Sequence, residues 1–388
     1  MSPSLAPSVL VADDQADIRT SLHLALKCAG FDAQMADSPE AVLAAVKTHH
    51  YDVLLMDLNY TRDTTSGGEG LDLLEDLKSV DRDLPVVAMT AWATIDLAVE
   101  AMRRGAGDFV LKPWDNATLL RTVQKQVETR RARNSREIAR TREVRDMDTA
   151  RRVQARLLPQ SAPRLRTVEI AGHCAEAGAI GGDGYDFIDL GSGRTAIVLS
   201  DVSGKGTPGA ILWAGLQATL RSRSTDLVMN APGVLADVNR LFFEATAPEH
   251  FATLFLGVYD DATRELSYVN CGHNAPILVR REGSDERLGS SAPALGLMTK
   301  WSGELRRETL RPGDTLIVYS DGVTEATGSD GDEYGEERLV AAIRGLHDEP
   351  VRELPEALLA RVSAFAQGEA QDDRTIVALR AVSQPPMI

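Results

Sequence analysis

The sequence has little cysteine and no long apolar run. Its three cysteines, among 388 residues, are widely spaced and belong to no CxxC or Cys/His pattern: Cys28, Cys174 and Cys271. This pattern argues against a disulfide framework and a zinc site, and it favours a reducing compartment, the cytoplasm. No stretch approaches about eighteen uninterrupted apolar residues, and the first residues lack the basic and apolar regions of a signal peptide. We therefore expect neither export nor membrane insertion.

Acidic residues outnumber basic residues outside one segment. A formal net charge of -15 disfavours nucleic-acid binding, which depends on neutralising phosphates. Residues 121–158 are the exception, with twelve Lys or Arg against five Asp or Glu. They show neither a recognition helix nor a basic region followed by sustained zipper heptads. We expect no nucleic-acid partner.

The change in composition divides the chain into three parts. At about 150 residues per domain, this length corresponds to two or three domains. We predict one domain over residues 1–120, a helical and possibly coiled-coil linker over 121–160, and a second domain over 161–388. The linker has neither Gly nor Pro before Pro159, which predicts one long helix. Its apolar stripe is thin, so two interpretations stay open: a solvated connector, or a signal-relaying helix that makes the protein a homodimer.

The first part alternates short apolar runs with helical patterns. This alternation predicts an α/β fold, a doubly wound parallel sheet. The runs expected to form strands are Val9–Ala12, Ala33–Met35, Val53–Met56, Val86–Met89 and Phe109–Leu111.

Polar side chains follow four of these runs. Asp13 and Asp14 come after the first run, Asp57 after the third, Thr90 after the fourth and Lys112 after the fifth. The carboxyl ends of parallel strands meet at one edge of a sheet, so these groups should converge. Carboxylates can hold a divalent ion, Asp57 can accept a phosphoryl group, and Lys112 can bind its oxygens. Helix capping would explain Asp14 alone, but it does not explain Lys112.

The arrangement resembles the receiver domain of two-component response regulators over residues 8–125. In that family a sensor histidine kinase phosphorylates one aspartate, an acidic pair binds Mg²⁺ with it, and a Thr, an aromatic residue and a Lys form the switch. The resemblance assigns phosphorylation to Asp57, Mg²⁺ to Asp13, Asp14 and Asp57, and the switch to Thr90, Phe109 and Lys112. The loop of residues 58–70 is longer than usual, which would alter kinase access or phosphate lifetime.

After Pro163 the sequence pattern changes to short strands separated by turns. This pattern is typical of an α+β domain with antiparallel sheet. The expected elements are the strands Thr195–Ser200, Thr315–Tyr319 and Thr375–Ala378, a hairpin of Thr253–Val258 with Leu266–Asn270, and the helices Pro208–Ser222 and Leu354–Phe365.

Four segments of this part place an aspartate beside small residues at a strand edge. They are Gly181–Phe187, Asp201–Gly206, Ser320–Glu325 and Gln371–Thr375. Carboxylates from distant places, with no Cys or His nearby, suit Mg²⁺ or Mn²⁺. Two such ions can activate water for in-line attack on phosphorus. A single Asp-Gly would predict only a turn, and Asp201–Gly206 lacks the spacing of a nucleotide-binding P-loop.

These segments closely resemble the SpoIIE/RsbU-type branch of PP2C-like serine/threonine phosphatases over about residues 165–382, together with Pro312–Ala326 and Cys271–Pro276. The resemblance implies an antiparallel-sheet sandwich that holds two Mg²⁺ or Mn²⁺ ions, with Asp201 bridging both. The implied catalytic ligands are Asp183, Asp201, Asp321 and Asp372, with Asp373 and the carbonyl of Val202 beside them.

Three positions depart from this pattern or leave it open. Gly184 stands where a bulky residue is common, so we expect a looser loop. His273 is either a general acid or a structural turn residue. No arginine in these segments is singled out as a ligand of substrate phosphate.

The sequence therefore predicts a cytoplasmic response regulator whose receiver controls a metal-dependent protein serine/threonine phosphatase. By resemblance, its substrate is a phosphorylated anti-sigma-factor antagonist of the STAS type. The alternative is a non-catalytic adaptor that only binds a partner under receiver control, although such proteins should have lost metal ligands. We expect phosphorylation to activate the phosphatase through the linker helix, with an apolar contact by Leu157.

Overall fold

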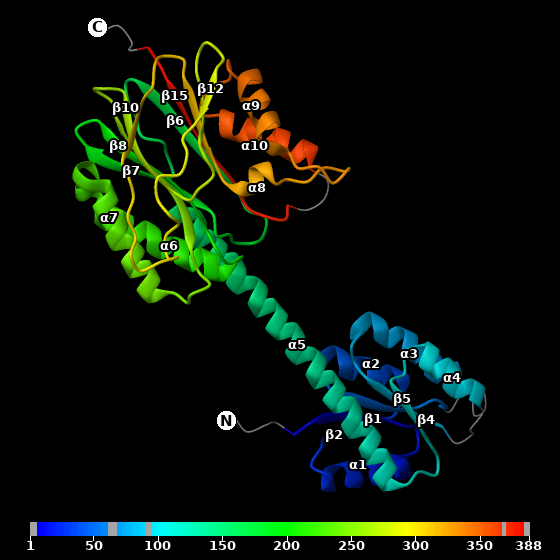
Figure 1. Ribbon diagram of the computed structural model, residues 1–388. Helices are drawn as coiled ribbons and strands as arrows, with labels where there is room; N and C mark the ends of the chain where they lie inside the picture. Colours follow the sequence, from blue (N-terminus) through cyan, green and yellow to red (C-terminus); the bar gives the residue numbers. More distant parts are fainter. Residues whose placement is uncertain (1–5, 61–67, 91–94, 367–369, 384–388) are drawn as a thin grey trace. The chain divides into compact units, whose positions relative to one another are not determined.

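The computed structural model describes residues 6–60, 68–90, 95–366 and 370–383 (Figure 1). The chain divides into two compact units, Met1–Glu143 and Val144–Ile388, each described by itself. Residues 61–67, the middle of the long loop after Asp57, lie outside the described residues. None of the described helices is both long and apolar enough to cross a bilayer.

Unit 1 is built on a five-stranded parallel sheet of order β2-β1-β3-β4-β5, which confirms the doubly wound α/β class. Helices cover both faces, and a separate apolar core fills each side. The strands are β1 (Ser8–Ala12), β2 (Asp32–Ala36), β3 (Val53–Asp57), β4 (Val86–Thr90) and β5 (Asp108–Leu111), and the helices between them are α1 (Ala16–Cys28), α2 (Pro39–Thr48), α3 (Gly68–Val80) and α4 (Ile95–Arg103).

The central strands are apolar on both faces because helices cover both faces. Every residue of β3 and β4 is buried, as the continuous apolar runs predict. The predicted linker helix is α5 (Asn116–Leu157), a single helix of 42 residues. Its first turns bury Leu119, Val123 and Val127 in the core of unit 1, whereas Ile138 and Val153 further along are more than half exposed.

Unit 2 contains two five-stranded sheets, ordered β13-β10-β9-β8-β7 and β12-β11-β14-β15-β6, whose paired strands are antiparallel. The strands are β6 (Val168–Ala175), β7 (Gly184–Gly191), β8 (Arg194–Val202), β9 (Ala252–Asp260), β10 (Glu265–Cys271), β11 (Ile277–Val279), β12 (Asp285–Arg287), β13 (Arg306–Thr309), β14 (Thr315–Tyr319) and β15 (Arg374–Ala381). The helices are α6 (Thr207–Ser222), α7 (Ser224–Ala245), α8 (Asp321–Thr324), α9 (Gly335–Gly345) and α10 (Leu354–Phe365).

The two sheets pack face to face and form a sandwich. Side chains from both sheets, such as Leu199 and Val377, share one buried cluster between them. The outer face of the first sheet packs on α6 and α7, and the outer face of the second packs on α8, α9 and α10 (Figure 1). The predicted antiparallel-sheet sandwich is therefore confirmed.

Candidate functional site

The acidic groups of unit 1 converge where the strand order changes direction, between β1 and β3. Asp13 directly follows β1, and Asp57 ends β3. One oxygen from each of Asp13, Asp14 and Asp57 lies within 4.8 Å of the others. Carboxylate oxygens at this spacing form a donor set that suits Mg²⁺. The edge of the sheet thus gathers the three acids that sequence reasoning selected.

Lys112 joins two of these acids. Its Nζ lies 2.6 Å from Asp13 Oδ2 and 2.7 Å from Asp57 Oδ2. Burial lowers the pKa of Lys112, but hydrogen bonds to both carboxylates outweigh this effect and leave its pKa raised. Burial also raises the pKa of Asp57, although Lys112 offsets part of that shift. Lys112 therefore holds the carboxylate in place and stays charged itself.

The remaining residues assigned to the switch differ in exposure. Thr90 is buried at the end of β4, whereas Phe109 is 40% exposed. Sequence reasoning missed Tyr60, which is buried and whose pKa is raised by burial and by the charges of Asp57 and Asp13. Only its position three residues after Asp57 pointed to it.

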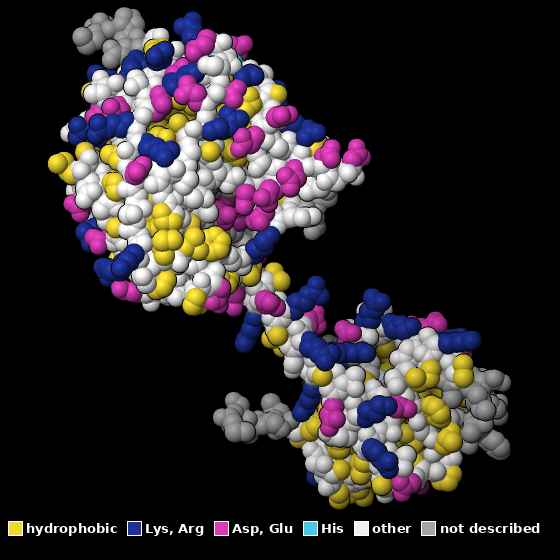
Figure 2. Space-filling model, viewed as in Figure 1, with side chains coloured by type: hydrophobic (Ala, Val, Ile, Leu, Met, Phe, Trp, Pro, Cys, Tyr) yellow, Lys and Arg dark blue, Asp and Glu magenta, His cyan; other side chains and the backbone are white. Residues whose placement is uncertain are grey.

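The second acidic cluster assembles from four places in unit 2. Asp183 immediately precedes β7, Asp201 lies near the end of β8, Asp321 begins α8, and Asp372 lies two residues before β15. Figure 2 shows acidic side chains gathering on the surface beside α8. In the described part of the chain, no three of these carboxylates approach as closely as the acids of unit 1 do. The cluster is therefore wider than the first.

Three of the four carboxylates, Asp183, Asp201 and Asp321, have raised pKa values. Burial and the charge of Asp201 raise the pKa of Asp183 well above its usual range. Burial, together with Asp321 and Asp372, raises the pKa of Asp201 to about 7. Burial and the charge of Asp372 also raise the pKa of Asp321. A cluster of acids that disfavours its own ionisation is stabilised by cations, and an all-oxygen donor set suits Mg²⁺ or Mn²⁺. The residues present therefore fit divalent metal ions.

The two adjacent aspartates before β15 have different surroundings. Asp373 is buried, and it accepts hydrogen bonds from the backbone N–H of Ala177 at 2.8 Å and of Gly182 at 2.9 Å. Asp372 is about half exposed, and it pairs with Lys205 at 3.0 Å. Asp373 thus fixes the loop that carries Asp183, whereas Asp372 faces the cluster.

Glycine at two positions beside Asp183 permits close packing. A Cβ at Gly182 would lie 2.6 Å from the carbonyl oxygen of Val202, so only glycine lets this loop approach that carbonyl. A Cβ at Gly184 would lie 2.1 Å from the indole of Trp213, which is fully buried. The indole of Trp213 therefore fills the space that a larger residue at position 184 would occupy. Because no empty space remains beside Gly184, the structure gives no support for the expected looser loop.

His273 lies beneath the surface. It is buried, its Nδ1 lies 2.9 Å from Thr253 Oγ1, and burial lowers its pKa to about 4. Its backbone N–H donates to Asn270 Oδ1 at 2.8 Å. A buried, neutral histidine with hydrogen bonds on two sides stabilises the turn. The structure therefore favours a structural turn residue over a general acid.

The end of α5 contacts the loops of the acidic cluster through polar groups. Gln154 is buried, and its side chain donates to the carbonyl of Gly181 at 2.7 Å and accepts from the N–H of Gly181 at 3.2 Å. Gln217 on α6 donates to the carbonyl of Leu157 at 2.7 Å. The predicted contact was the apolar side chain of Leu157, but the side chain that reaches the Asp183 loop is Gln154.

Sequence reasoning also missed Thr375 and Lys205, although both lie in segments it selected. Thr375 Oγ1 donates to Asp183 Oδ2 at 2.8 Å. The only indication in the sequence was that Thr375 and Lys205 lie in the same segments as expected ligands. A contact between β15 and the Asp183 loop leaves no pattern in the sequence.

Comparisons with known proteins find a family match in each unit of the chain. Residues 9–124 match the family described as response regulator receiver domain, and residues 191–382 match the family described as Stage II sporulation protein E (SpoIIE). The chain therefore joins a response-regulator receiver domain to a SpoIIE-type, PP2C-like phosphatase domain.

Individual relatives cover one or other part of the chain. Protein IcfG of Synechocystis sp. is 32% identical in an alignment of 225 residues that covers 51% of this chain and 35% of IcfG. A structure of the RsbU and RsbW domains of a Mycobacterium tuberculosis protein is 26% identical with a TM-score of 0.50, covering 59% of this chain and 64% of that one.

The SiaA-PP2C domain of Pseudomonas aeruginosa shares the fold, with a TM-score of 0.54 at 20% identity, covering 62% of this chain and 98% of that one. The chain spans about a third or less of the first curated relatives, 35% of IcfG and 25% of the regulatory protein AtoC of Escherichia coli.

Proposed function

We propose that this chain is a response regulator in which phosphorylation of Asp57 by a sensor histidine kinase controls a metal-dependent protein serine/threonine phosphatase. The substrate proposed by resemblance is a phosphorylated anti-sigma-factor antagonist of the STAS type. The observation that carries the proposal is the cluster of Asp183, Asp201, Asp321 and Asp372, in which burial and neighbouring carboxylates raise the pKa values of the first three. The proposed domain division remains 1–120, 121–160 and 161–388.

The proposed metal ligands in unit 2 are the four carboxylates, the carbonyl of Val202 and, less directly, Asp373. Two Mg²⁺ or Mn²⁺ ions suit this set better than one, because the carboxylates spread more widely than those of unit 1. When bound, such ions would supply an activated water and neutralise charge on the phosphoryl group. A single Mg²⁺ is proposed at Asp13, Asp14 and Asp57.

The chain's own residues hold the ligands in place. Thr375 orients Asp183 through its hydroxyl, and Asp373 anchors the loop on which Asp183 lies. Lys205 pairs with Asp372 and keeps that exposed side chain beside the cluster. These contacts support catalysis, because a non-catalytic adaptor would have no need to position four carboxylates.

The direct test is metal-dependent phosphate release. The purified protein should hydrolyse p-nitrophenyl phosphate and a phosphoserine protein with Mg²⁺ or Mn²⁺, and excess chelator should abolish the reaction. Readdition of metal should restore it. Turnover that persists in chelator would contradict the proposed chemistry, and no turnover with any metal would favour the adaptor.

We expect Gln154→Ala to uncouple phosphatase rate from receiver phosphorylation. The variant removes both hydrogen bonds that tie α5 to Gly181, so movement of the helix no longer reaches the Asp183 loop. The ratio of rates with and without a small phosphodonor should fall to about one, while the intact mass still shows phosphorylation.

The matched control for this variant is Val153→Ala, which alters the adjacent residue of the same helix, and that residue is 57% exposed. It should keep the full response. Inserting two residues near Thr141 rotates the downstream face of the helix by about 200° and should abolish the response. If the insertion variant responds fully, α5 is a passive tether.

A further inference from the structure

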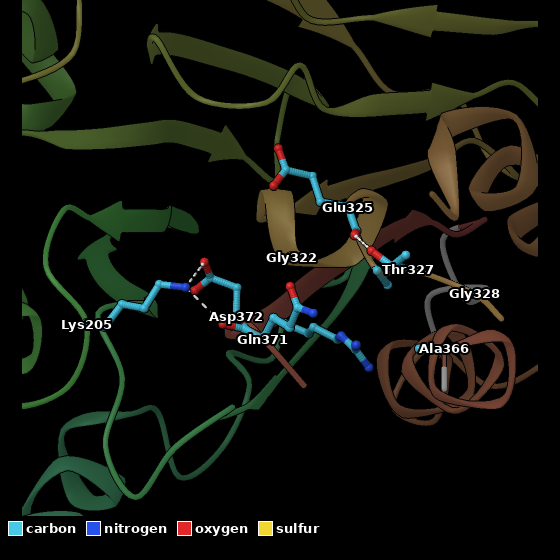
Figure 3. A pocket seen from close by; sticks show the side chains of 10 residues that line it. Lys205, Gly322, Glu325, Thr327, Gly328, Ala366, Gln371 and Asp372 are labelled. Carbon is cyan, nitrogen blue, oxygen red and sulfur yellow. Dashed lines mark hydrogen bonds and ion pairs between the residues drawn. The ribbon is translucent and has the colours of Figure 1, made fainter. Parts of the chain in front are cut away.

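A cavity of about 280 Å³ opens beside Asp372, next to the proposed metal site. Its lining comes from the loop after β8, the end of α8 and the start of β15. Figure 3 shows Lys205 pointing toward Asp372 from one side of the cavity, with Thr327 on the other side. The cavity thus adjoins the acidic cluster and is large enough for a side chain of another protein.

Arg374 lines this cavity although only 8% of its surface is exposed. Within the described residues, its guanidinium makes a 3.5 Å hydrogen bond to Ser363 Oγ, and its Nε has no partner. No carboxylate of the described residues lies within ion-pair distance of the Arg374 guanidinium, whose only side-chain partner among them is Ser363. The described part of the chain therefore supplies no counter-ion for this nearly buried cation.

The direction of Arg374 follows from the alternation of side chains along a strand. Asp373 and Thr375 both reach the Asp183 loop, so Arg374 between them faces the other side of β15, toward α10. The strand thereby presents its acid and hydroxyl to the metal-site loop and its cation to the cavity.

A second arginine on the same strand shows what a structural role looks like. Arg380 donates to Thr315 Oγ1 at 3.1 Å and to the carbonyls of Glu349 at 2.6 Å and Leu346 at 3.4 Å. Arg374 has no comparable set. An arginine stays charged, and a charge taken from water without a partner destabilises the folded state. An external anion would supply the missing partner, and a guanidinium fits the paired oxygens of phosphate or carboxylate.

We propose that Arg374, with Lys205 at the mouth of the cavity, binds an oxyanion carried by the phosphoprotein substrate. The oxyanion is either the phosphoryl group itself or the carboxylate of an acidic residue near the phosphoserine. The proposal rests on the phosphatase function proposed above, and it adds a substrate-binding residue to that site.

The test compares Arg374→Met with wild type and with Arg380→Met, a matched control on the same strand. Three substrates are used: p-nitrophenyl phosphate and two phosphoserine peptides whose flanking residues are either glutamates or glutamines. We expect Arg374→Met to lower kcat/KM about 10- to 100-fold for at least the glutamate peptide, as the loss of a charged hydrogen bond predicts. The kcat/KM of Arg374→Lys should lie between the values of wild type and Arg374→Met.

The substrates distinguish the sources of the oxyanion. If the phosphoryl group is the ligand, Arg374→Met lowers kcat/KM by a similar factor for all three substrates. If a carboxylate is the ligand, p-nitrophenyl phosphate is unaffected and the preference for the glutamate peptide disappears. An Arg374→Met enzyme that matches wild type on all three substrates would overturn the proposal.

Two further measurements separate this proposal from the proposed function. If wild type turns over none of the substrates, the phosphatase function fails, and calorimetry of the glutamate peptide and of inorganic phosphate then tests the cavity alone. Equal affinity of wild type and Arg374→Met for both probes would overturn the proposal.

Thermal unfolding is the second measurement. Arg374→Met should unfold at the same or a higher temperature than wild type, whereas Arg380→Met should unfold at a lower temperature. Equal losses of stability would show that Arg374 is structural.

Discussion

Asp201→Asn is expected to lower phosphatase turnover by at least about 1,000-fold, because by resemblance this carboxylate would help to hold both proposed ions, which would supply the activated water. The substitution keeps the shape of the side chain and removes its charge, so the fold should survive. The measurement is the steady-state rate on p-nitrophenyl phosphate at saturating Mg²⁺ or Mn²⁺. Activity close to wild type would remove Asp201 from the site.

Asp201→Asn should lower activity, but it should raise the stability of the folded protein when metal is absent. The pKa of Asp201 is about 7 in the folded protein against an ordinary 3.8, so the folded state binds a proton more tightly than the unfolded state. Stability from this group is present below about pH 4 and is lost as the pH rises through 7. In chelator at pH 8, Asp201→Asn should therefore be more stable than wild type, by on the order of 1–3 kcal/mol.

Thermal unfolding in chelator at pH 8 and pH 5 checks this expectation. The advantage of the variant should shrink at pH 5, where wild type takes up the proton. Added Mg²⁺ or Mn²⁺ should reverse the order at pH 8, since metal stabilises the charged carboxylates of wild type. A variant that is less stable than wild type in chelator at pH 8 would show that Asp201 is not under electrostatic strain.

Asp57→Asn should abolish phosphorylation by a small phosphodonor. Asp57 lies at the end of β3, held by Lys112 at 2.7 Å and close to Asp13 and Asp14, and an amide cannot form the acyl phosphate. Intact mass after incubation with phosphodonor and Mg²⁺ should show one phosphoryl group on wild type and none on the variant.

Asp76→Asn is a suitable control for the loss of one acid, because Asp76 is exposed on α3 of the same unit. It should be labelled as fully as wild type. The phosphatase rate of Asp57→Asn should not respond to phosphodonor, while its rate with metal alone persists. Equal labelling of Asp57→Asn and wild type would place the phosphorylation site elsewhere.

The sequence predicted best the elements whose burial leaves a local pattern. Strands β3 and β4 are buried on both faces and appear as unbroken apolar runs, and α10 was predicted with the bounds it has. Helix α7 was not predicted, because Pro232 and Gly233 interrupt its pattern. In the structure Asn230 leaves the helical conformation and accepts from the N–H of Gly233 at 3.0 Å, so a new helical segment begins there.

The site residues divide in the same way. Aspartates beside small residues at strand ends are visible along the chain because the local turn requires both. Gln154 and Arg374 carry no local signal, because the significance of each depends on which distant segment the fold places beside it. A buried glutamine in a basic helix and an arginine without an acid become informative only when their neighbours are known.

The position of β15 has a consequence for how unit 2 is made in the cell. This strand pairs with β14 on one side and with β6 on the other, so the first and last strands of the unit lie side by side. While the ribosome is still adding residues before Arg374, β6 lacks its neighbour and its edge is open to other chains. Asp372, Asp373 and Thr375 are synthesised with that final strand, so a nascent chain that ends before them cannot assemble the proposed metal site. A partly synthesised chain therefore lacks the proposed catalytic site until synthesis has passed β15.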